Sequence, residues 1–540
     1  MVQLIIYKPI FFLEMCGILA ILLPDGATRN KLKKTMTNLQ KRGPDETGHY
    51  EDTNIFIGHT RLSIVHPEAG PQPILYKGWV GSMNGEIYNA KPTKDQTDCH
   101  HLVAAVLEHG IQTLSQMDGM FSFFLYHPET KRVIMGRDPI GITPMYYSQT
   151  VVSSLLACQM NQLVRHVPTG SATSFVLGET PKWHKYVQPY QFVHPSTGSL
   201  EHLMTKAVSK RLMGDVPWGV LLSGGLDSSI IAAIAVKIAA KKRPDYPKVH
   251  TFCIGLENSP DMIQAKRLAD DLGTHHTAIS YTTDEGIAVL KEVIRAVETY
   301  DVTTIRASTP MWLLARAISK RGVKMVLSGE GSDELFAGYL YNLYCPGPQQ
   351  MEDECRRKIA DLYAYDCARA NKSMGDWSVE TRVPFLDNDV VDYAMNGLDP
   401  TTKLSGTHPE GPKAEKWFLR ETFQHLLPSY ITERTKAQFS DAVGSEWIGA
   451  LSAHAEMTVS LQQLKLAASR WPFQTPDTKE AYLYRLIFDE LFSEISGSEE
   501  TVIYQPSIAC SSKPATEWHE NFQKCLDPSG DAIQRAFTVS

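Results

Sequence analysis

The sequence lacks the features that mark zinc-bound, disulfide-linked or membrane-spanning proteins. Its 540 residues include 9 cysteines, but these form no CxxC pair and no His/Cys cluster at zinc-ligand spacing. Such scattered thiols argue against a structural zinc or disulfide framework and for a reducing compartment. No apolar run approaches the roughly 20 residues that a transmembrane helix requires. We therefore expect no membrane partner.

The chain also lacks an excess of positive charge. Its net charge is −7, with 43% hydrophobic and 21% charged residues, as in ordinary globular proteins. This excludes a broad basic surface for nucleic acid. Residues 1–14 have neither the basic start and cleavage site of a secretory signal nor the Arg and Ser of a mitochondrial presequence. Cytosol is the default expectation.

The distribution of apolar residues predicts two domains. Up to about Pro181, short β-branched and aromatic runs alternate with turns, which indicates antiparallel sheets with segregated helices, an α+β class. Beyond a Pro-containing linker, apolar strands alternate with helices, which indicates an α/β domain with a parallel sheet. The predicted boundaries are an extension at 1–15, domains at 16–185 and 200–500, and an irregular tail at 501–540.

The stretch VLLSGGLDSS, Val220–Ser229, predicts a phosphate-binding loop. An apolar strand ends in Ser223-Gly224-Gly225, and a helix begins near Asp227. The glycines let backbone N–H groups approach an oxyanion, and the helix N-terminus favours negative charge. Asp227 would repel bare phosphate, so a Mg²⁺ between them is the economical interpretation. An N-capped helix after a tight turn is the plainer alternative.

This loop is of neither common nucleotide-binding type. The chain contains no Gly-Lys dipeptide, which excludes a Walker loop, and the stretch lacks GxGxxG. It resembles the pyrophosphate loop of enzymes that cleave ATP to AMP and pyrophosphate.

A second loop of similar make-up, SGEGSDE, follows another apolar strand at residues 328–334. Ligands of open α/β sheets gather at the carboxyl ends of strands, so both loops can face one ATP. A solvated turn is the alternative interpretation.

Several motifs in the first domain point to a known family. Cys16 precedes Gly17 and an apolar strand, and KRGPDETG, GHTRLSIV, NGEIYN and GRDPIGITPMYY follow in that order. This order resembles a glutamine amidotransferase domain with an N-terminal Cys nucleophile. Together with the two loops, the chain resembles glutamine-hydrolysing asparagine synthetases, from about Met15 to Pro528.

The resemblance implies a fold and a reaction. The fold would be an N-terminal-nucleophile hydrolase sandwich (αββα) followed by a parallel-sheet domain of the ATP-pyrophosphatase type. The substrates would be glutamine, aspartate and ATP with Mg²⁺. The products would be asparagine, glutamate, AMP and pyrophosphate, and the enzyme would be a homodimer. Ammonia would cross unprotonated through a dry channel between the domains.

In the first domain the resemblance assigns Cys16 as the nucleophile and its own α-amine as the base. The implied oxyanion donors are Asn84 and the N–H of Gly85. The implied glutamine ligands are Arg61 for the α-carboxylate and Glu86 and Asp98 for the α-ammonium, together with Asn84 and Gly85. Taken singly, each has a plainer interpretation: Cys16 as a buried small hydrophobic residue, Asn84-Gly85 as a hairpin turn, and Arg61 as a member of a surface ion pair.

In the second domain the resemblance implies three sets of ligands. ATP would be held by Leu221, Ser223, Gly224, Gly225, Leu226, Asp227, Ser228, Ser229, Ile254, Ser328 and Gly329. Mg²⁺ would be held by Asp227 and Asp333. Aspartate would be held by Thr303, Thr304 and Arg306, although a structural ion pair is an alternative for Arg306. Glu330 and Lys436 would be catalytic, Glu330 in forming the intermediate and deprotonating ammonia, Lys436 in neutralising phosphate charge.

The chain departs from the family pattern at its start and in two segments. Residues 1–14 precede Met15 and would block the Cys16 amine, so we expect Met15 to be the working start. The segment from Asn89 to Asp98 is shorter than usual. The stretch ACQMNQL, Ala157–Leu163, replaces the usual charged residues. The usual HRGPD is KRGPD here.

These departures keep other functions open. One is an ammonia-fed synthetase with a silent glutaminase domain. A relative that closes a β-lactam is less favoured, because such enzymes usually lose the Cys that is present here. A non-catalytic nucleotide-binding regulatory homologue is the alternative of another class.

Overall fold

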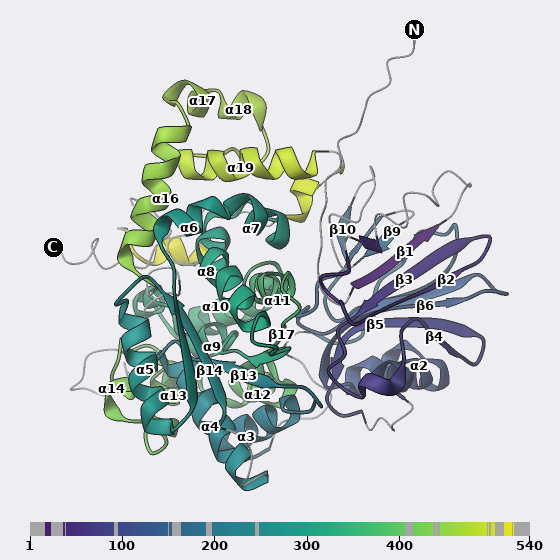
Figure 1. The fold of residues 1–540 in the computed structure, drawn as a ribbon, viewed down its shortest axis with the longest axis horizontal. Coiled ribbons are helices and arrows are strands. Elements are labelled where there is room, and N and C mark those ends of the chain that lie inside the picture. Colours follow the sequence, from purple (N-terminus) through teal and green to yellow (C-terminus); the bar gives the residue numbers. More distant parts are fainter. Residues whose placement is uncertain are drawn as a thin grey trace.

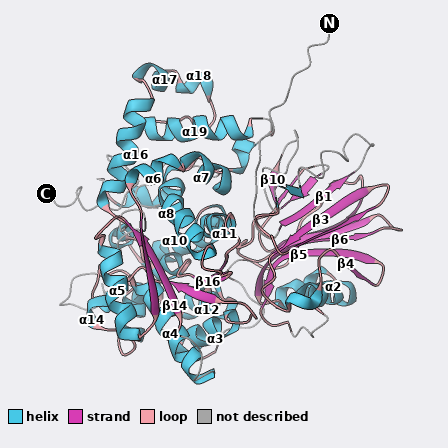
Figure 2. Cartoon of the chain, viewed as in Figure 1, coloured by secondary structure: helices cyan, strands magenta, loops and turns pink. Residues whose placement is uncertain are grey.

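The computed structural model describes a chain of two parts, one rich in strands and one rich in helices (Figure 1, Figure 2). The residues it describes are 17–22, 36–37, 39–90, 96–148, 151–153, 164–188, 190, 197–242, 248–404, 414–435, 439, 443–493, 495, 498–502, 512–520 and 522. Within these residues, no helix has both the length and the apolar character needed to cross a membrane.

The first part contains two six-stranded antiparallel sheets. One has the order β10-β8-β9-β1-β3-β2, with β1 Gly17–Leu22, β2 Glu46–Glu51, β3 Ile55–Arg61, β8 Tyr146–Tyr147, β9 Val151–Ser153 and β10 Arg165–His166. The other has the order β12-β11-β7-β6-β5-β4, with β4 Ile74–Tyr76, β5 Trp79–Ile87, β6 Gly119–His127, β7 Arg132–Arg137, β11 Ser171–Val176 and β12 His184–Lys185.

Alternation along the strands buries both faces of the second sheet. In β6, Phe124 and Tyr126 pack with Ile18 of β1 between the two sheets. Phe121 and Phe123 of the same strand face the opposite way and pack under α2 (Asp98–His109). The β6 sequence GMFSFFLYH is apolar on both faces because one face packs against the other sheet and the opposite face packs under α2.

The second part is built on a five-stranded sheet of order β15-β14-β13-β16-β17, in which every neighbouring pair is parallel. Its strands are β13 Trp218–Leu221, β14 His250–Gly255, β15 His275–Ser280, β16 Met325–Leu327 and β17 Glu380–Arg382. The prediction of antiparallel sheets followed by a parallel α/β sheet is thus confirmed.

Helices cover both faces of the parallel sheet and extend beyond it (Figure 1). They are α3 Leu200–Arg211, α4 Leu226–Lys242, α5 Pro260–Leu272, α6 Thr283–Ala288, α7 Leu290–Val297, α8 Val302–Ser319, α9 Ser332–Phe336, α10 Pro348–Asp361, α11 Asp366–Gly375, α12 Asn388–Asp392, α13 Trp417–Phe423, α14 Ser429–Thr432, α16 Ser445–Thr458, α17 Leu461–Lys465, α18 Ala467–Arg470 and α19 Lys479–Phe492. Short 3₁₀ helices lie at Pro67–Ala69, Ile111–Gln116, Leu340–Tyr344, Leu362–Ala364, Pro384–Leu386, Pro400–Lys403, Ser498–Thr501 and Pro514–Trp518.

One apolar cluster joins the two parts of the molecule. Tyr88, Met120 and Ile142 of the first part pack in the same buried cluster as Leu222 and Val383 of the second. The interface between the two parts is therefore apolar at this point and excludes water.

Candidate active site

The loop after β13 is folded by its own serines and glycines. Ser228 Oγ accepts a hydrogen bond from the Ser223 N–H at 3.2 Å, and Ser229 Oγ donates to the Gly225 carbonyl at 2.7 Å. Gly224 has φ +74°, and a Cβ there would lie 2.7 Å from the Ala265 nitrogen. Only glycine fits this position, because both the backbone angle and the space exclude a side chain.

The predicted ATP residues converge on one cavity at the carboxyl ends of the strands. It is lined by Leu221, Ser223, Gly225, Leu226, Asp227, Ser228, Ile254, Ser328 and Gly329, and also by Thr303, Glu330 and Asp333. Gly224 and Ser229 support the loop, although they do not line the cavity. The two loops therefore face one site, as their positions after parallel strands predict.

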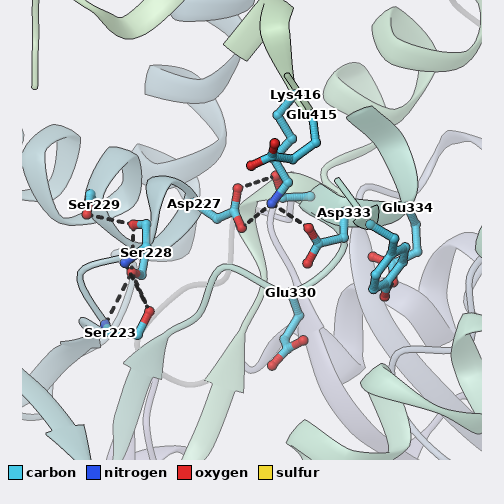
Figure 3. Close-up of polar contacts among 12 residues, drawn as sticks. Ser223, Asp227, Ser228, Ser229, Glu330, Asp333, Glu334, Glu415 and Lys416 are labelled. Carbon is cyan, nitrogen blue, oxygen red and sulfur yellow. Dashed lines mark hydrogen bonds and ion pairs between the residues drawn. The ribbon is translucent and has the colours of Figure 1, made fainter. Parts of the chain in front are cut away.

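Asp227 and Asp333, the predicted metal ligands, point at a common position (Figure 3). The ammonium of Lys416 lies there, 2.5 Å from Asp227 Oδ2 and 2.5 Å from Asp333 Oδ1. Ser332 Oγ donates to Asp227 Oδ1 at 2.7 Å. Two carboxylates that share one cation position are suitable donors for Mg²⁺, which usually takes its other ligands from phosphates and water. No group of three or more metal-ligating side chains occurs in the described part of the chain.

Lys416 is a functional candidate that sequence reasoning missed. Its side chain is 2% exposed, and its backbone has φ +55°, unusual for a residue with a side chain. Strained backbone of this kind clusters at functional sites. The local sequence AEKWFLR reads as an ordinary amphipathic helix start, so only the long-range pairing with Asp227 reveals the role.

Glu330 lies on the cavity wall beside a guanidinium. Arg369 Nη2 donates to Glu330 Oε2 at 2.6 Å, and its Nη1 lies 2.5 Å from Asp366 Oδ1. Burial lowers the pKa of Arg369, but Asp366 and Glu330 outweigh it and the net shift is upward, so the guanidinium stays charged. Arg369 also lines the cavity and was not predicted from the sequence.

A second carboxyl group of the same loop is held neutral. Burial, followed by the charges of Asp366 and Asp333, raises the pKa of Glu334 to about 8. The Tyr339 hydroxyl donates to Glu334 Oε1. The site therefore holds a carboxyl group of raised pKa, Glu334, close to Glu330 and its Arg369 partner, and such perturbed groups are common at sites that move protons.

Lys436 lies outside the described residues, but the chain just before it is anchored in the site. Arg434 donates from Nη1 to the Gly224 carbonyl at 3.0 Å and from Nη2 to Asp261 at 2.5 Å. These bonds tie the segment to the pyrophosphate loop.

The predicted aspartate residues separate in the structure. Thr303 lines the cavity, whereas the Thr304 N–H donates at 2.8 Å to Asp301, the residue that caps the N-terminus of α8. Arg306 donates from Nε and Nη2 to the two oxygens of Glu480 at 2.9 and 2.7 Å, and both side chains are buried. The ion-pair alternative considered for Arg306 is the arrangement observed, and Arg306 is not among the residues lining the cavity.

In the first domain, the side-chain amide of Asn84 is buried and donates to no other residue that the structure describes. Asn84 is 5% exposed, and its Nδ2 has no hydrogen-bond partner among the described residues. Its neighbour Gly85 has φ +117°, and a Cβ there would lie 1.9 Å from the Met120 carbonyl oxygen. A buried amide without a partner costs free energy unless a ligand uses it, which suits an oxyanion donor.

Cys16, the predicted nucleophile, lies outside the described residues, as does the extension before it. The strand that follows it is placed: Gly17 pairs with Thr60 in β3, next to Arg61. The guanidinium of Arg61 donates to Glu46 at 2.7 Å and to the backbone carbonyls of residues 65–67. A bound carboxylate would therefore share Arg61 with Glu46.

The two predicted ammonium ligands lie together. Asp98 Oδ2 accepts the Ile87 N–H at 3.0 Å, and the Glu86 and Asp98 carboxyl groups are hydrogen-bonded to each other. Burial raises the pKa of Asp98 to about 6, and burial also raises that of Glu86 well above its usual range. The pair is adjacent even though the Asn89–Asp98 segment is short. Residues 157–163, the other altered segment, lie outside the described residues.

Comparison with known families agrees with this geometry. The family described as "Asparagine synthase" matches residues 199–348 and 344–510. The family described as "Glutamine amidotransferase domain" matches residues 15–194.

Full-length relatives are similar over almost the whole chain. The chain is 43% identical over 535 residues to "Asparagine synthetase B [glutamine-hydrolyzing]" of Escherichia coli (strain K12), covering 94% of this chain and 96% of that protein. It is 43% identical over 551 residues to "Asparagine synthetase [glutamine-hydrolyzing] 3" of Arabidopsis thaliana, covering 96% and 94%. The Asparagus officinalis enzyme is 42% identical over 550 residues, covering 96% and 92%. With both domains matched and this identity over the whole length, the chain belongs to the family of glutamine-hydrolysing asparagine synthetases.

Proposed function

We propose that this chain makes asparagine in two half-reactions, hydrolysing glutamine in the first domain and activating aspartate with ATP in the second. The observation that carries the proposal is the cavity lined by both predicted loops, residues 223–229 and 328–334. Asp227, Glu330 and Asp333 of these loops converge there. A cavity with this set of groups suits a nucleotide whose pyrophosphate leaves.

The glutaminase half uses Cys16 as the nucleophile. Its thiol proton passes to its own α-amine, which is neutral often enough near pH 8 to accept it, whereas a peptide nitrogen cannot. This requires the mature chain to begin at Cys16. The stacked antiparallel sheets with α2 outside support an N-terminal-nucleophile hydrolase fold. Asn84 Nδ2, buried without a partner among the described residues, stabilises the developing oxyanion together with the Gly85 N–H.

The ends of the glutamine molecule are held by charge. Arg61 binds the α-carboxylate, while Glu86 and Asp98 bind the α-ammonium. A positive group at the Glu86–Asp98 pair lets both carboxyl groups ionise, because it offsets the burial that otherwise keeps them protonated.

In the synthetase half, the side chain of the substrate aspartate reacts with ATP. The β-carboxylate attacks the α-phosphorus, pyrophosphate leaves, and β-aspartyl-AMP forms. Asp227 and Asp333 would hold Mg²⁺, and the ion would supply positive charge to neutralise the departing pyrophosphate. Lys416 lies at the same carboxylates and is available to phosphate oxygens. Lys436 follows the anchored Arg434 in the sequence, and its role in neutralising phosphate charge rests on the family resemblance. Glu330 accepts a proton from ammonia as it attacks the acyl carbon and AMP leaves.

Ammonia travels between the sites without meeting bulk water. The apolar cluster of Tyr88, Met120, Ile142, Leu222 and Val383 supports such a route. Ammonia stays unprotonated there because an ammonium ion is costly to bury. We further propose that the enzyme is a cytosolic homodimer.

The test is a pyrophosphate-release assay with ATP, Mg²⁺ and aspartate, comparing glutamine with ammonium chloride as the nitrogen source. Release and asparagine formation with both sources are expected. Asparagine formation with ammonium chloride but not with glutamine would mean a silent glutaminase domain. No activity with either source would leave a regulatory homologue and contradict the proposal.

A further inference from the structure

Arg382 connects one residue of each proposed site, although it does not itself line the nucleotide cavity. It ends β17, an edge strand of the parallel sheet on the side facing the strand-rich part (Figure 1). Its side chain is fully buried, and Nη2 donates across the domain boundary to Glu86 Oε1 at 2.9 Å. Nε donates to Glu380 at 2.6 Å, and Nη1 donates to the Arg211 carbonyl at 3.0 Å. The guanidinium is thus held on every side.

The backbone of the same residue supports the ATP loop. Leu327 of β16 pairs with Arg382 in the sheet, and the Ser328 N–H donates to the Arg382 carbonyl oxygen at 2.9 Å. Ser328 and Gly329 line the nucleotide cavity directly afterwards. One residue therefore connects a proposed ATP-binding backbone to a proposed glutamine-binding carboxylate.

Other ion pairs cross the boundary without making this connection. Lys210 pairs with Asp118, and Lys324 pairs with Asp45 at 2.8 Å. Neither acidic partner is a proposed ligand of glutamine. They hold the domains together, whereas Arg382 is bonded to a residue of the glutamine site.

The Glu86 carboxyl group has two hydrogen-bond partners that act on it in opposite ways. Its carboxyl group is bonded to Arg382 on one side and to Asp98 on the other. Bonding to Arg382 favours the carboxylate, which an α-ammonium needs, while sharing a proton with Asp98 favours the neutral form. A small movement of the guanidinium therefore changes how well Glu86 receives glutamine.

We propose that Arg382 is a positioning residue that links nucleotide occupancy of the synthetase site to glutamine affinity in the amidotransferase site. ATP on the loop fixes the Ser328 backbone, Ser328 fixes the Arg382 main chain, and the guanidinium then holds the Glu86 side chain in the position that receives glutamine. Such coupling is reciprocal, so glutamine-site occupancy tightens ATP to the same extent. This inference rests on the proposed two-site function.

The first experiment uses the wild-type enzyme. The KM for glutamine in the glutaminase reaction is measured with and without ATP, and the Kd of the product L-glutamate is measured by calorimetry under the same two conditions. Allosteric coupling of ordinary strength predicts about a five-fold or larger tightening by ATP. Identical values with and without ATP would overturn the proposal.

The second experiment uses variants. Arg382→Met should raise the KM for glutamine at least about ten-fold and abolish the effect of ATP on it, with ammonia-dependent synthesis retained. Arg382→Lys, which keeps the charge, should restore part of the effect of ATP on the KM for glutamine. If the Met variant does not fold, the Lys variant is compared with the wild type in its place. Asp118→Asn, which breaks a boundary ion pair without touching Glu86, is the matched control.

The outcomes separate the coupling from the function itself. If Arg382→Met and Asp118→Asn respond alike to ATP, Arg382 is only part of the interface and the inference is wrong. If wild-type enzyme lacks both glutaminase and ammonia-dependent activity, the proposed function fails instead.

Discussion

Removing the charge of Lys416 should make the stability of the synthetase domain depend on magnesium. In Lys416→Met, Asp227 and Asp333 lose the ammonium that lies 2.5 Å from each. At an effective dielectric constant of about 20, each contact is worth about 7 kcal/mol before desolvation is counted. Breaking a buried pair by removing one partner costs about 3–5 kcal/mol in practice. We expect the lower value, because the carboxylates are 14% and 17% exposed and water can reach them.

Mg²⁺ should recover most of that loss. At a concentration of about 100 times its Kd, a bound ligand stabilises the folded state by about 2.7 kcal/mol. The gain should be smaller in the wild type, because there the ion must displace the ammonium. The assay is the midpoint of thermal unfolding by intrinsic fluorescence, followed in EDTA and over a Mg²⁺ titration.

A matched control comes from another buried lysine. Lys372 lies 2.8 Å from Glu298, and their side chains are 2% and 1% exposed. Lys372→Met should lower the midpoint similarly, but Mg²⁺ should not restore it. If Lys416→Met keeps the wild-type midpoint in EDTA, or responds to Mg²⁺ no more than Lys372→Met, the reasoning on the two carboxylates is refuted.

Four further predictions follow from the same geometry. Arg306→Met should cost about 3–5 kcal/mol of stability, and the double variant with Glu480→Met should recover most of it in denaturant unfolding. If the double variant also keeps the wild-type KM for aspartate, Arg306 does not bind aspartate. Asn84→Ala should lower glutaminase kcat about 10²–10³-fold, and stopped assays giving less than ten-fold would exclude an oxyanion role. The pKa of Asp98 is about 6, and its ionised carboxylate is proposed to bind the α-ammonium of glutamine, so the KM for glutamine should rise as the pH falls below 6. A KM that does not change with pH would contradict this. Glu330→Gln should abolish asparagine formation from glutamine and from ammonia while glutaminase persists, as chromatography of both products would show.

Short-range patterns were sufficient to predict the phosphate loops. In VLLSGGLDSS the apolar strand, the glycine turn and the helix start are neighbours in the chain, so each is visible locally. The parallel order of the strands then brings the second loop to the same sheet edge, and the cavity contains both.

Pairings between distant segments could not be predicted in this way. Lys416 meets Asp227, and Arg382 meets Glu86, across domains or long stretches of chain. A lysine at a helix start and an arginine in VETRVPFLD have ordinary surface interpretations until the partner is known. Cys16 and Lys436 stay predictions, because they lie outside the described residues.

The bond between Arg306 and Glu480 has a consequence for shortened forms of this chain. Every proposed ligand of ATP, aspartate and Mg²⁺ precedes residue 437, so a protein truncated after that point would retain the complete catalytic inventory. It would nevertheless lack α19, and with it the carboxylate that neutralises a guanidinium buried in α8. An unpaired charge of that kind is not tolerated in an apolar core. The first residues of α8, among them Thr303, would then shift to bring Arg306 to water. A nonsense or frameshift lesion beyond the last catalytic residue should therefore be as damaging as one within the site.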